Sequence, residues 1–305
     1  MSRVLVIGAA GMIGRKLVAR LRKEGASEII QQDVVPFEGV VSDLSKPGEA
    51  EKLVAKRPDL IFHLAAVVSG EAEADFDKGY RVNLDGTRFL FEAIRKEAYK
   101  PKVVFTSSIA VFGAPFPDAI GDEFLNAPLT SYGTQKAIGE LLLSDYSRRG
   151  LFDGVGIRLP TICVRPGKPN KAASGFFSGI LREPLAGQEA VLPVPDTVRH
   201  WFASPRAAIE FLIHASRINT ELLGTRRNLS MPGLSATVAE QIAALGRVAG
   251  DKATRLIRRE PDQTIMRIVE GWPRNFDARR ALSLGFRPDP SFDDIIRYHM
   301  EDELR

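Results

Sequence analysis

The chain has 305 residues, of which 44% are hydrophobic and 26% are charged, proportions typical of a soluble globular protein with a sizeable core. The formal net charge is only +4, and the basic residues are scattered apart from Arg255–Arg259. This balance argues against nucleic-acid binding, which needs a concentrated basic surface, but it suits a small anionic substrate. No apolar stretch approaches the ~20 residues of a membrane span. We therefore expect a cytoplasmic protein that binds neither nucleic acid nor membrane.

The single cysteine, Cys163, excludes an intramolecular disulfide, so nothing indicates an oxidising compartment. It lies in an apolar stretch without a neighbouring histidine, which favours a buried packing residue over a nucleophile. His63 has no companions at metal-ligand spacing, so we expect a packed strand residue and no metal site.

Short apolar runs alternate with segments of helical periodicity through the first 160 residues. This order predicts an α/β fold, a doubly wound parallel sheet whose strands are apolar throughout because helices cover both faces. The predicted strands are Arg3–Ile7, Glu28–Gln32, Val40–Val41, Leu60–Leu64, Lys102–Thr106 and Gly154–Leu159. The predicted helices are Ile13–Glu24, Ser45 to about Lys56, Ala74–Glu97 and Ser131–Arg149.

Recurrent prolines interrupt this rhythm after Leu159. We expect residues 1–160 to form a dinucleotide-binding domain, and residues 161–305 to form a smaller, loop-rich, substrate-binding domain that is partly interleaved with the first. Helices are predicted in this second part near Ser204–Ser216, Ala236–Val248, Asp277–Leu284 and Asp293–Glu303.

A glycine-rich turn joins the first predicted strand to the first helix. Its spacing is GxxGxxG, in which the first glycine permits a tight turn, the second allows close approach to a pyrophosphate, and the third allows the helix to pack on the strand. Free N–H groups at the helix N-terminus then attract the phosphates. A tight turn without a ligand is the alternative. The expected contacts are Gly8, Gly11, Met12, Ile13 and Gly14.

Acidic residues follow the second and third predicted strands. Asp33 stands about 20 residues after the glycine turn, where a carboxylate accepts both ribose hydroxyls and repels a 2′-phosphate, so NAD is favoured over NADP. A strand-end turn residue is the alternative for Asp33. Two interpretations stay open for Asp43 with Leu44: contact with the adenine, or a turn.

Tyr132 and Lys136 form a YxxxK unit near the start of a predicted helix, where the i,i+4 spacing places both side chains on one face. A tyrosine phenol titrates near ~10, so it is a poor base at neutral pH. A nearby ammonium and a positive nicotinamide ring favour the phenolate, and we expect them to lower that pKa. Lys136 is also expected to hold the nicotinamide ribose. YxxxK alone also occurs by chance, so its neighbours matter.

A pair of serines, Ser107 and Ser108, ends the strand that precedes this helix. Ligands of open α/β sheets bind at the carboxyl ends of the strands, so one of these hydroxyls is placed to bond a reacting hydroxyl group. From the residues alone the two serines compete for this role, and a pair satisfied by backbone groups is the alternative.

These residues together resemble the extended short-chain dehydrogenase/reductase family. The resemblance rests on the glycine turn, Asp33, Asp43-Leu44, His63–Ala66, Asn83, Ser107–Gly113 and Tyr132/Lys136, in the family's order. It implies a catalytic trio of Ser108, Tyr132 and Lys136, with Ser108 matching better than Ser107. It also implies that the cofactor is lined by Leu64, Ala65, Ala66 and Asn83, and by Pro160, Thr161 and Ile162 at the nicotinamide carboxamide.

Two departures from the family's nucleotide-sugar enzymes narrow the expected substrate. Ile109-Ala110 stands where dehydratases carry an Asp-Glu pair, and Pro160-Thr161-Ile162 stands where nucleotide-sugar enzymes usually place an Asn. Leu159–Gly175 and Leu192–Phe202 resemble instead a subgroup, related to the threonine dehydrogenase branch, that oxidises the C2 hydroxyl of a short sugar acid such as D-erythronate to a 2-oxo acid.

The resemblance then gives the expected reaction and its substrate contacts. Tyr132 takes the hydroxyl proton, the nicotinamide takes the hydride, and a bidentate arginine binds the carboxylate. Arg199 is the first candidate because it matches the family's substrate arginine, and the others are Arg165, Lys168 and Lys171. For each of these basic residues, a solvated surface charge is the alternative. The full set of expected substrate residues is Ser69, Ser108, Ile109, Tyr132, Arg165 and Arg199.

Two other functions remain as alternatives on the same fold. A nucleotide-sugar epimerase keeps its NAD bound and releases no NADH, and a dinucleotide sensor typically lacks the Tyr or the Lys, both of which stand here. Members of the family often dimerise through the equivalent helices, so the resemblance implies a homodimer that packs through Ala74–Glu97 and Ser131–Arg149.

Overall fold

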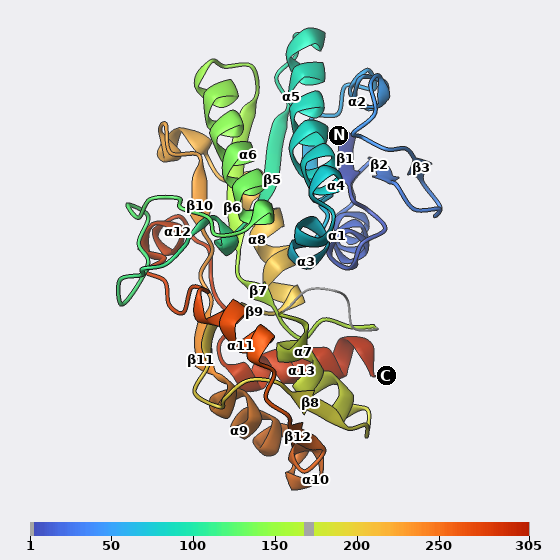
Figure 1. The fold of residues 1–305 in the computed structure, drawn as a ribbon. Helices are drawn as coiled ribbons and strands as arrows, with labels where there is room; N and C mark the ends of the chain where they lie inside the picture. The colour runs from blue at the N-terminus through green and yellow to red at the C-terminus, as the bar shows by residue number, and fades with distance from the viewer. Residues whose placement is uncertain (1–2, 168–173, 305) are drawn as a thin grey trace.

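A computed structural model describes residues 3–167 and 174–304 and shows a large α/β core above a smaller one (Figure 1). Seven parallel strands form the large sheet in the order β10-β6-β5-β4-β1-β2-β3, which confirms the predicted doubly wound parallel sheet. Their bounds are β1 Arg3–Ile7, β2 Glu28–Asp33, β3 Val40–Val41, β4 Leu60–His63, β5 Lys102–Ser108, β6 Asp153–Leu159 and β10 Asn228–Ser230.

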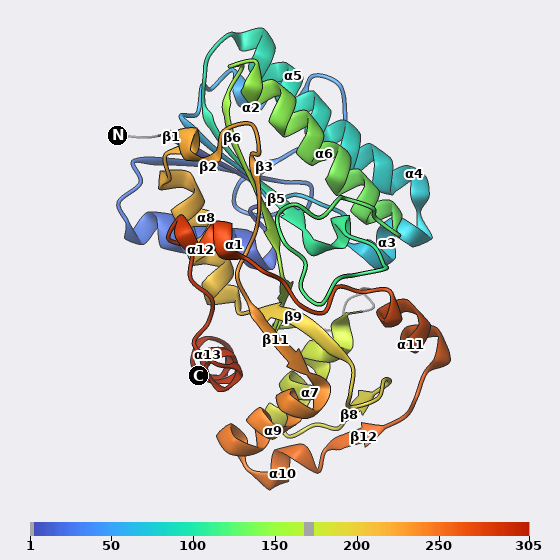
Figure 2. The ribbon, with the colours of Figure 1, turned by 90° about the vertical axis from the view of Figure 1, so that its left-hand side faces the viewer.

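Helices cover both faces of this sheet, as Figure 2 shows from the side. On one face, Val4 and Val6 pack with α1 and α8, whereas on the other, Leu5 and Ile7 pack with α2, α5 and α6. Because successive side chains of β1 enter different cores, the strand is apolar at every position from Val4 to Ile7 rather than at alternate ones. The helix bounds are α1 Met12–Lys23, α2 Glu49–Val54, α5 Gly86–Glu97, α6 Ser131–Arg148 and α8 Pro205–Arg217.

The strand order reverses at β1, which has β2 on one side and β4 on the other. Connections from β1 and β4 therefore leave the sheet in opposite directions, and a crevice opens between their carboxyl ends. The glycine turn follows β1 and the Leu64–Ala66 segment follows β4, so the chain brings both predicted cofactor segments to this crevice.

The smaller core is built by the second half of the chain around a separate apolar cluster. A three-stranded sheet in the order β11-β9-β7 and a two-stranded sheet of β8 and β12 pack against its helices. The strands are β7 Thr161–Ile162, β8 Ala190–Leu192, β9 Arg199–Ala203, β11 Leu234–Thr237 and β12 Ile257–Arg259. The helices are α7 Gly175–Leu185, α9 Val238–Ala249, α10 Asp251–Thr254, α11 Gln263–Glu270 and α13 Phe292–Glu303.

Not every late element belongs to this smaller core. Strand β10 pairs in parallel with β6 at the edge of the large sheet, and α8 packs on its face beside α1. Ala281 of α12 (Arg279–Ser283) and Phe286 join the same cluster. The chain therefore crosses between the two cores more than once.

The helical stretch predicted over roughly Ala74–Glu97 is present from Phe76 to Glu97, as α4 (Phe76–Gly79), a π-helical turn over Tyr80–Asp85, and α5. It begins two residues later than predicted, and a separate helix, α3 (Ser69–Ala74), precedes it. The break falls at Asp75, whose side chain accepts a hydrogen bond from the Lys78 N–H at 3.0 Å and caps the new helix. Helix α2 also begins later than predicted, because Gly48 adopts a left-handed conformation with φ 85° just before it.

Candidate active site

The glycines of the turn after β1 differ in whether the fold or a bound ligand requires them. A Cβ on Gly8, whose φ is +86°, would lie 2.7 Å from the Ala65 nitrogen, and a Cβ on Gly14 would lie 2.2 Å from the Gly8 carbonyl oxygen. The fold itself requires both glycines. A Cβ on Gly11 would meet only the Gly8 carbonyl oxygen, at an ordinary 3.4 Å, and Gly11 is exposed at the N-cap of α1. Only Gly11 faces open space at the helix N-terminus, where an anion binds.

This difference gives a prediction for two substitutions. Gly11→Val will raise the dissociation constant for NADH about tenfold or more, since each 1.4 kcal/mol of lost contact costs a factor of ten, while the melting temperature stays unchanged. Gly14→Ala will destabilise the fold by about 1–3 kcal/mol, because the overpacking outweighs the gain in helix propensity. Fluorescence titration and thermal melts measure both effects. Equal loss of stability in both variants would contradict the assignment.

Asp33 lies at the end of β2, directly beside the glycine turn. Its Oδ2 accepts a hydrogen bond from the Ala10 N–H at 2.9 Å, and its Oδ1 accepts one from the Val34 N–H at 2.7 Å. The Gln32 carbonyl oxygen accepts from the Gly8 and Ala9 N–H groups at 2.9 and 3.0 Å. The end of β2 thus shapes the turn and places a carboxylate at its rim.

Asp43 is engaged in a local turn. Its Oδ1 accepts from the Ser45 N–H at 3.0 Å and from the Ser45 hydroxyl at 2.6 Å, and Arg81 approaches its Oδ2 at 3.4 Å. Burial raises the pKa of Asp43, but these bonds and Arg81 more than offset it, so the pKa lies below its ordinary value. Leu44 is buried. The geometry therefore favours the turn interpretation of Asp43.

Asn83 is buried and holds the segment that follows β4. Its Oδ1 accepts from the Val67 N–H at 2.7 Å, and its Nδ2 donates to the Val67 carbonyl oxygen at 3.1 Å and to Gln135 Oε1 at 2.7 Å. The amide is thus used within the protein, and it fixes the chain next to Ala65 and Ala66. Asn83 shapes the cofactor side of the crevice from behind.

Ser108 and Tyr132 lie close together because helix α6 begins against the 3-10 turn Ile109–Val111 that follows β5. A Cβ on Gly133 would lie 2.2 Å from the Ala110 carbonyl oxygen, so only a glycine permits this approach. The Thr130 hydroxyl accepts from the Gly133 N–H at 3.0 Å and caps the helix there. The Ser108 side chain consequently lies near enough to the phenol of Tyr132 to lower its pKa.

Lys136 lies one turn further along α6 and is almost completely buried, with 3% of its surface exposed. Its Nζ donates to the Thr106 carbonyl oxygen at 2.8 Å and stands 5.0 Å from the centre of the Phe105 ring and 5.8 Å from that of Tyr132. Burial lowers the pKa of Lys136 to about 8, with Glu140 opposing the shift. At neutral pH the side chain is still an ammonium.

The expectation that Lys136 lowers the pKa of Tyr132 is not met by the protein groups alone, without the nicotinamide ring. Burial raises the pKa of the Tyr132 phenol above its ordinary value, and the groups that pull it down are the Ser108 hydroxyl and the Arg165 guanidinium. Desolvation dominates here because the phenolate is the charged form. Ser108 and Arg165 are therefore the protein groups that favour the phenolate.

The structure separates the two serines at the end of β5. Ser107 is buried, and its hydroxyl donates to Glu140 Oε1 at 2.5 Å. Ser108 is half-buried, accepts from the Ala110 N–H at 3.2 Å, and faces Tyr132. Only Ser108 is placed to meet a substrate.

Arg165 is held rigidly near Tyr132. Its Nε donates to the Ile162 carbonyl oxygen at 3.0 Å and its Nη2 to the Ser174 hydroxyl at 3.1 Å. Burial lowers its pKa, which nearby Cys163 and Tyr132 raise. Among the described residues, no Asp or Glu forms an ion pair with Arg165. Its charge therefore remains available to an anion.

Arg199 is engaged elsewhere. Its Nη1 donates to the Ser235 carbonyl oxygen at 3.0 Å, and its Nη2 lies 3.3 Å from a Glu240 carboxylate oxygen. Geometry thus favours Arg165 over Arg199 as the substrate arginine, reversing the expected order, because a neighbouring carboxylate already neutralises Arg199. Lys168 and Lys171 lie outside the described residues.

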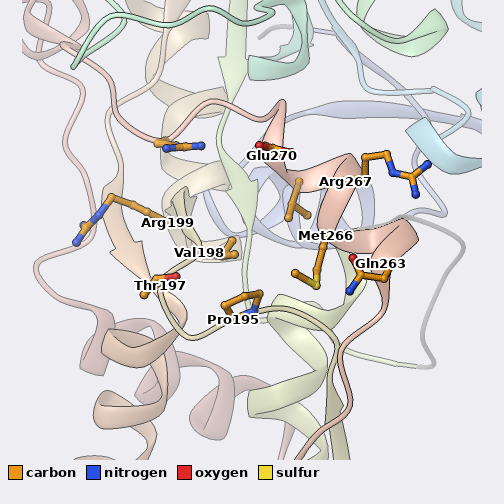
Figure 3. A pocket seen from close by; sticks show the side chains of 10 residues that line it. Pro195, Thr197, Val198, Arg199, Gln263, Met266, Arg267 and Glu270 are labelled. Carbon is orange, nitrogen blue, oxygen red and sulfur yellow. The ribbon is translucent and has the colours of Figure 1, made fainter.

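Arg199 also borders an open cavity of about 480 Å³ between β9 and α11. Figure 3 shows Val198 and Met266 on the wall and the Arg199 guanidinium turned away from them. Arg267 and Glu270 stand on the same cavity. Its lining residues come from the smaller core alone.

The remaining expected contacts lie at the start of α3, directly after β5, and between β6 and β7. Ser69 begins α3 and is half-buried, and Ile109 is buried directly after Ser108. Pro160 is buried, and the Thr161 hydroxyl pairs with His200 Nε2 at 2.7 Å.

Two predictions about residues outside the site hold. His63 is buried, and burial, with Lys136 nearby, lowers its pKa to about 3. Cys163 is buried, and burial raises the pKa of its thiol to about 12, so it is a packing residue and not a nucleophile. Over the described ranges, no three His, Cys, Asp or Glu side chains are grouped to hold a metal, and no helix is long and apolar enough to cross a membrane.

Sequence reasoning missed a buried ionic cluster behind the site. Glu140, one turn beyond Lys136, is paired with Arg158 of β6, and Asn126 joins them. The signal in the sequence was slight: an acid four residues after the lysine on the same helix face. A sequence pattern does not disclose that an acid on a helix is buried.

The fold and the site together define a class of protein: a doubly wound dinucleotide-binding enzyme with a Ser–Tyr–Lys site. The match to a family model makes this specific. The chain belongs to the NAD dependent epimerase/dehydratase family, whose model matches residues 4–203. The family resemblance predicted from the motifs is thereby confirmed, as is use of a nicotinamide dinucleotide.

Two relatives resemble the chain over nearly its whole length. A D-erythronate dehydrogenase of Cupriavidus necator is 47% identical and covers 98% of each chain. A D-erythronate dehydrogenase of Haemophilus influenzae is 40% identical over 99% of this chain and 100% of its own.

Solved structures share the fold. One, described as a nucleoside-diphosphate-sugar epimerase from Agrobacterium tumefaciens, is 66% identical with a TM-score of 0.94, covering 99% of this chain and 94% of its own. An L-threonine dehydrogenase from Clostridium difficile, at 23% identity and a TM-score of 0.89 over 99% and 97% of the chains, has the same fold.

Proposed function

We propose that this chain is an NAD-dependent dehydrogenase that oxidises the C2 hydroxyl of a short sugar acid, D-erythronate, to 2-oxo-erythronate. The observation that carries the proposal is the end-to-end similarity to two D-erythronate dehydrogenases, at 47% and 40% identity. The site is suited to this chemistry, because the Tyr132 phenol stands near a serine hydroxyl, a buried ammonium and a guanidinium that forms no ion pair with any described residue.

Each residue has one task in the proposed reaction. Tyr132, as phenolate, takes the proton of the C2 hydroxyl, and Ser108 donates a hydrogen bond to the same oxygen as its charge develops. Lys136 keeps a positive charge beneath the phenol. The dinucleotide, when bound at the glycine turn, supplies the acceptor for the hydride.

Arg165 binds the carboxylate of the sugar acid in this proposal. That carboxylate is bonded directly to C2, so its partner must stand within a few ångströms of Tyr132. Arg165 is close enough to affect the pKa of Tyr132, and its own anchors hold it still. A pre-positioned guanidinium loses little entropy when it binds.

The proposal also assigns cofactor binding and substrate binding to different parts of the chain. Residues 1–160 hold the dinucleotide, and residues 161–305, which include Arg165, form the substrate side. Asp33 at the rim of the glycine turn supports NAD over NADP, since its carboxylate repels a 2′-phosphate. We also expect a cytoplasmic homodimer that packs through the side-by-side helices α5 and α6 (Figure 2).

A panel of four- to six-carbon aldonates, each with NAD and NADP, tests the substrate and the cofactor. We expect reduced cofactor to appear with D-erythronate and NAD, with at least tenfold lower kcat/KM for NADP. Activity with NADP alone would refute the assignment of Asp33. UDP-glucose and UDP-galactose are tested in parallel, because the Agrobacterium structure is described as an epimerase. Interconversion of these sugars without NADH, and no oxidation of aldonates, would replace the proposed function.

A further inference from the structure

Helix α6 carries a third ionisable residue on the face of Tyr132 and Lys136. Glu140 follows Lys136 by four residues, and its side chain is only 2% exposed. Arg158 of β6 grips it with two bonds, from Nε to Oε1 at 2.8 Å and from Nη2 to Oε2 at 2.7 Å. The face of α6 that carries Tyr132 and Lys136 thus also carries one partner of a buried ion pair.

Two further donors complete the surroundings of this carboxylate. The Ser107 hydroxyl donates to Oε1 at 2.5 Å, and the Asn126 Nδ2 donates to Oε2 at 3.0 Å. Four hydrogen bonds therefore fix the carboxylate in one orientation. A buried carboxylate without such donors would be too costly to keep charged.

The bond from Ser107 ties this cluster to the reacting groups. Ser107 stands between Ser108, which faces Tyr132, and Thr106, whose carbonyl oxygen accepts from Lys136 at 2.8 Å. Three consecutive residues of β5 thus contact three successive turns of α6. The Glu140 bond fixes the distance between this strand end and the helix.

We propose that Glu140 is a positioning residue for the dehydrogenase reaction: its buried carboxylate sets Ser108 against Tyr132 and supplies the negative charge that keeps Lys136 an ammonium. The proposal rests on the proposed function for its kinetic consequences. Stability alone is a weak reason for such a pair, because apolar side chains of similar volume often replace buried ion pairs without loss.

The charges around Lys136 support the electrostatic half of this proposal. On α6 it faces Glu140, and on β4 it faces His63, which burial keeps neutral. Arg158 on β6 is paired with Glu140, and Arg165 beyond β7 acts on Tyr132. Glu140 raises the pKa of Lys136 against the effect of burial. Without it, Lys136 must lose its proton at a lower pH.

The decisive variants separate charge from geometry. Glu140→Gln/Arg158→Met removes both buried charges and so avoids leaving one unpaired. We expect the alkaline limb of its kcat–pH profile to move down, but by less than the loss of Glu140 alone would give, because the like charge of Arg158 is removed with it. Ser107→Ala keeps the Glu140 charge but loses the hydrogen bond that links Glu140 to β5. We therefore expect kcat to fall about tenfold, with the alkaline limb of the pH profile unchanged. Ser144→Ala, which loses a hydroxyl that donates to the Glu140 carbonyl oxygen and accepts from Asn228 Nδ2, is the matched control.

A second readout does not depend on the substrate. NMR titration of ¹⁵N-labelled lysine, assigned with Lys136→Met, will give a lower Lys136 pKa in the double variant than in the wild-type protein. If wild-type protein leaves D-erythronate unoxidised but this shift appears, the proposed substrate fails and the role of Glu140 stands. A folded double variant with unchanged Lys136 titration overturns the charge role. Ser107→Ala with unchanged kcat overturns the geometric role, even if the double variant does not fold.

Discussion

Tyr132→Phe will lower kcat for D-erythronate oxidation by about 10²- to 10⁴-fold, the usual contribution of a positioned general base. The variant keeps the aromatic ring that packs near Lys136 and loses only the phenol oxygen that meets Ser108. Affinity for NADH and the melting temperature should stay within twofold and a few degrees of the wild-type values. Stopped-flow or steady-state absorbance of NADH measures the loss.

The matched control for this variant is Tyr99→Phe. The Tyr99 hydroxyl is buried and, among the described residues, has no hydrogen-bond partner, and it lies near the amino end of β5, opposite the site. Its removal should leave kcat unchanged. Full turnover by a folded Tyr132→Phe variant that still binds NADH would exclude Tyr132 as the base.

Arg165→Met will lower kcat/KM for D-erythronate by about 10- to 100-fold, mostly through KM. A hydrogen bond to a charged group contributes about 1.5–3 kcal/mol, which corresponds to this range. Arg165→Lys should recover only part of the loss, since an ammonium lacks the bidentate fork. Neutral alcohols, which have no carboxylate, should show only the smaller loss of kcat that follows from a higher pKa of Tyr132.

Arg199→Met is the comparison that distinguishes the two arginines. Arg199 is paired with Glu240 at 3.3 Å with 38% of its side chain exposed, so its loss should change stability by at most about 1 kcal/mol and KM by less than threefold. A large rise in KM for Arg199→Met, with little effect at Arg165, would reverse the assignment. Both variants should keep their affinity for NADH.

The sequence was sufficient to predict the large sheet and the segments that line its crevice. Strands such as β4 and β5 are buried on both faces, so they stand out as uninterrupted apolar runs. The glycine turn was equally clear, because two of its three glycines are demanded by backbone contacts within a few residues or across to Ala65. Features that depend on such local contacts can be predicted from the sequence.

The second half of the chain was harder to predict, for reasons that lie in its packing. Helix α7 contains Pro184 and was not predicted, although it supplies Phe177 and Ile180 to the smaller core. Helix α11 has eight residues and is mostly exposed. Short elements of this kind are stabilised by tertiary contacts, which a single sequence does not reveal.

Electrostatic relations within the site depended on the fold in the same way. Spacing placed Tyr132 and Lys136 on one face of a helix, but it could not show that burial would raise the pKa of the phenol. Nor could it show that Glu240 pairs with Arg199 while Arg165 forms no ion pair with any residue that the structure describes. Ion pairs between residues 41 positions apart, like the burial that shifts a pKa, appear only when the chain has folded.

The repeated crossing of the chain between its two cores has a consequence for dissecting this enzyme. A fragment that ends at residue 160 would leave β6 as a bare sheet edge and strip α1 of its neighbour α8, exposing an apolar face to water. Such a piece would aggregate rather than bind NADH. The dinucleotide half and the substrate half must therefore be synthesised, and exchanged between relatives, as one inseparable unit.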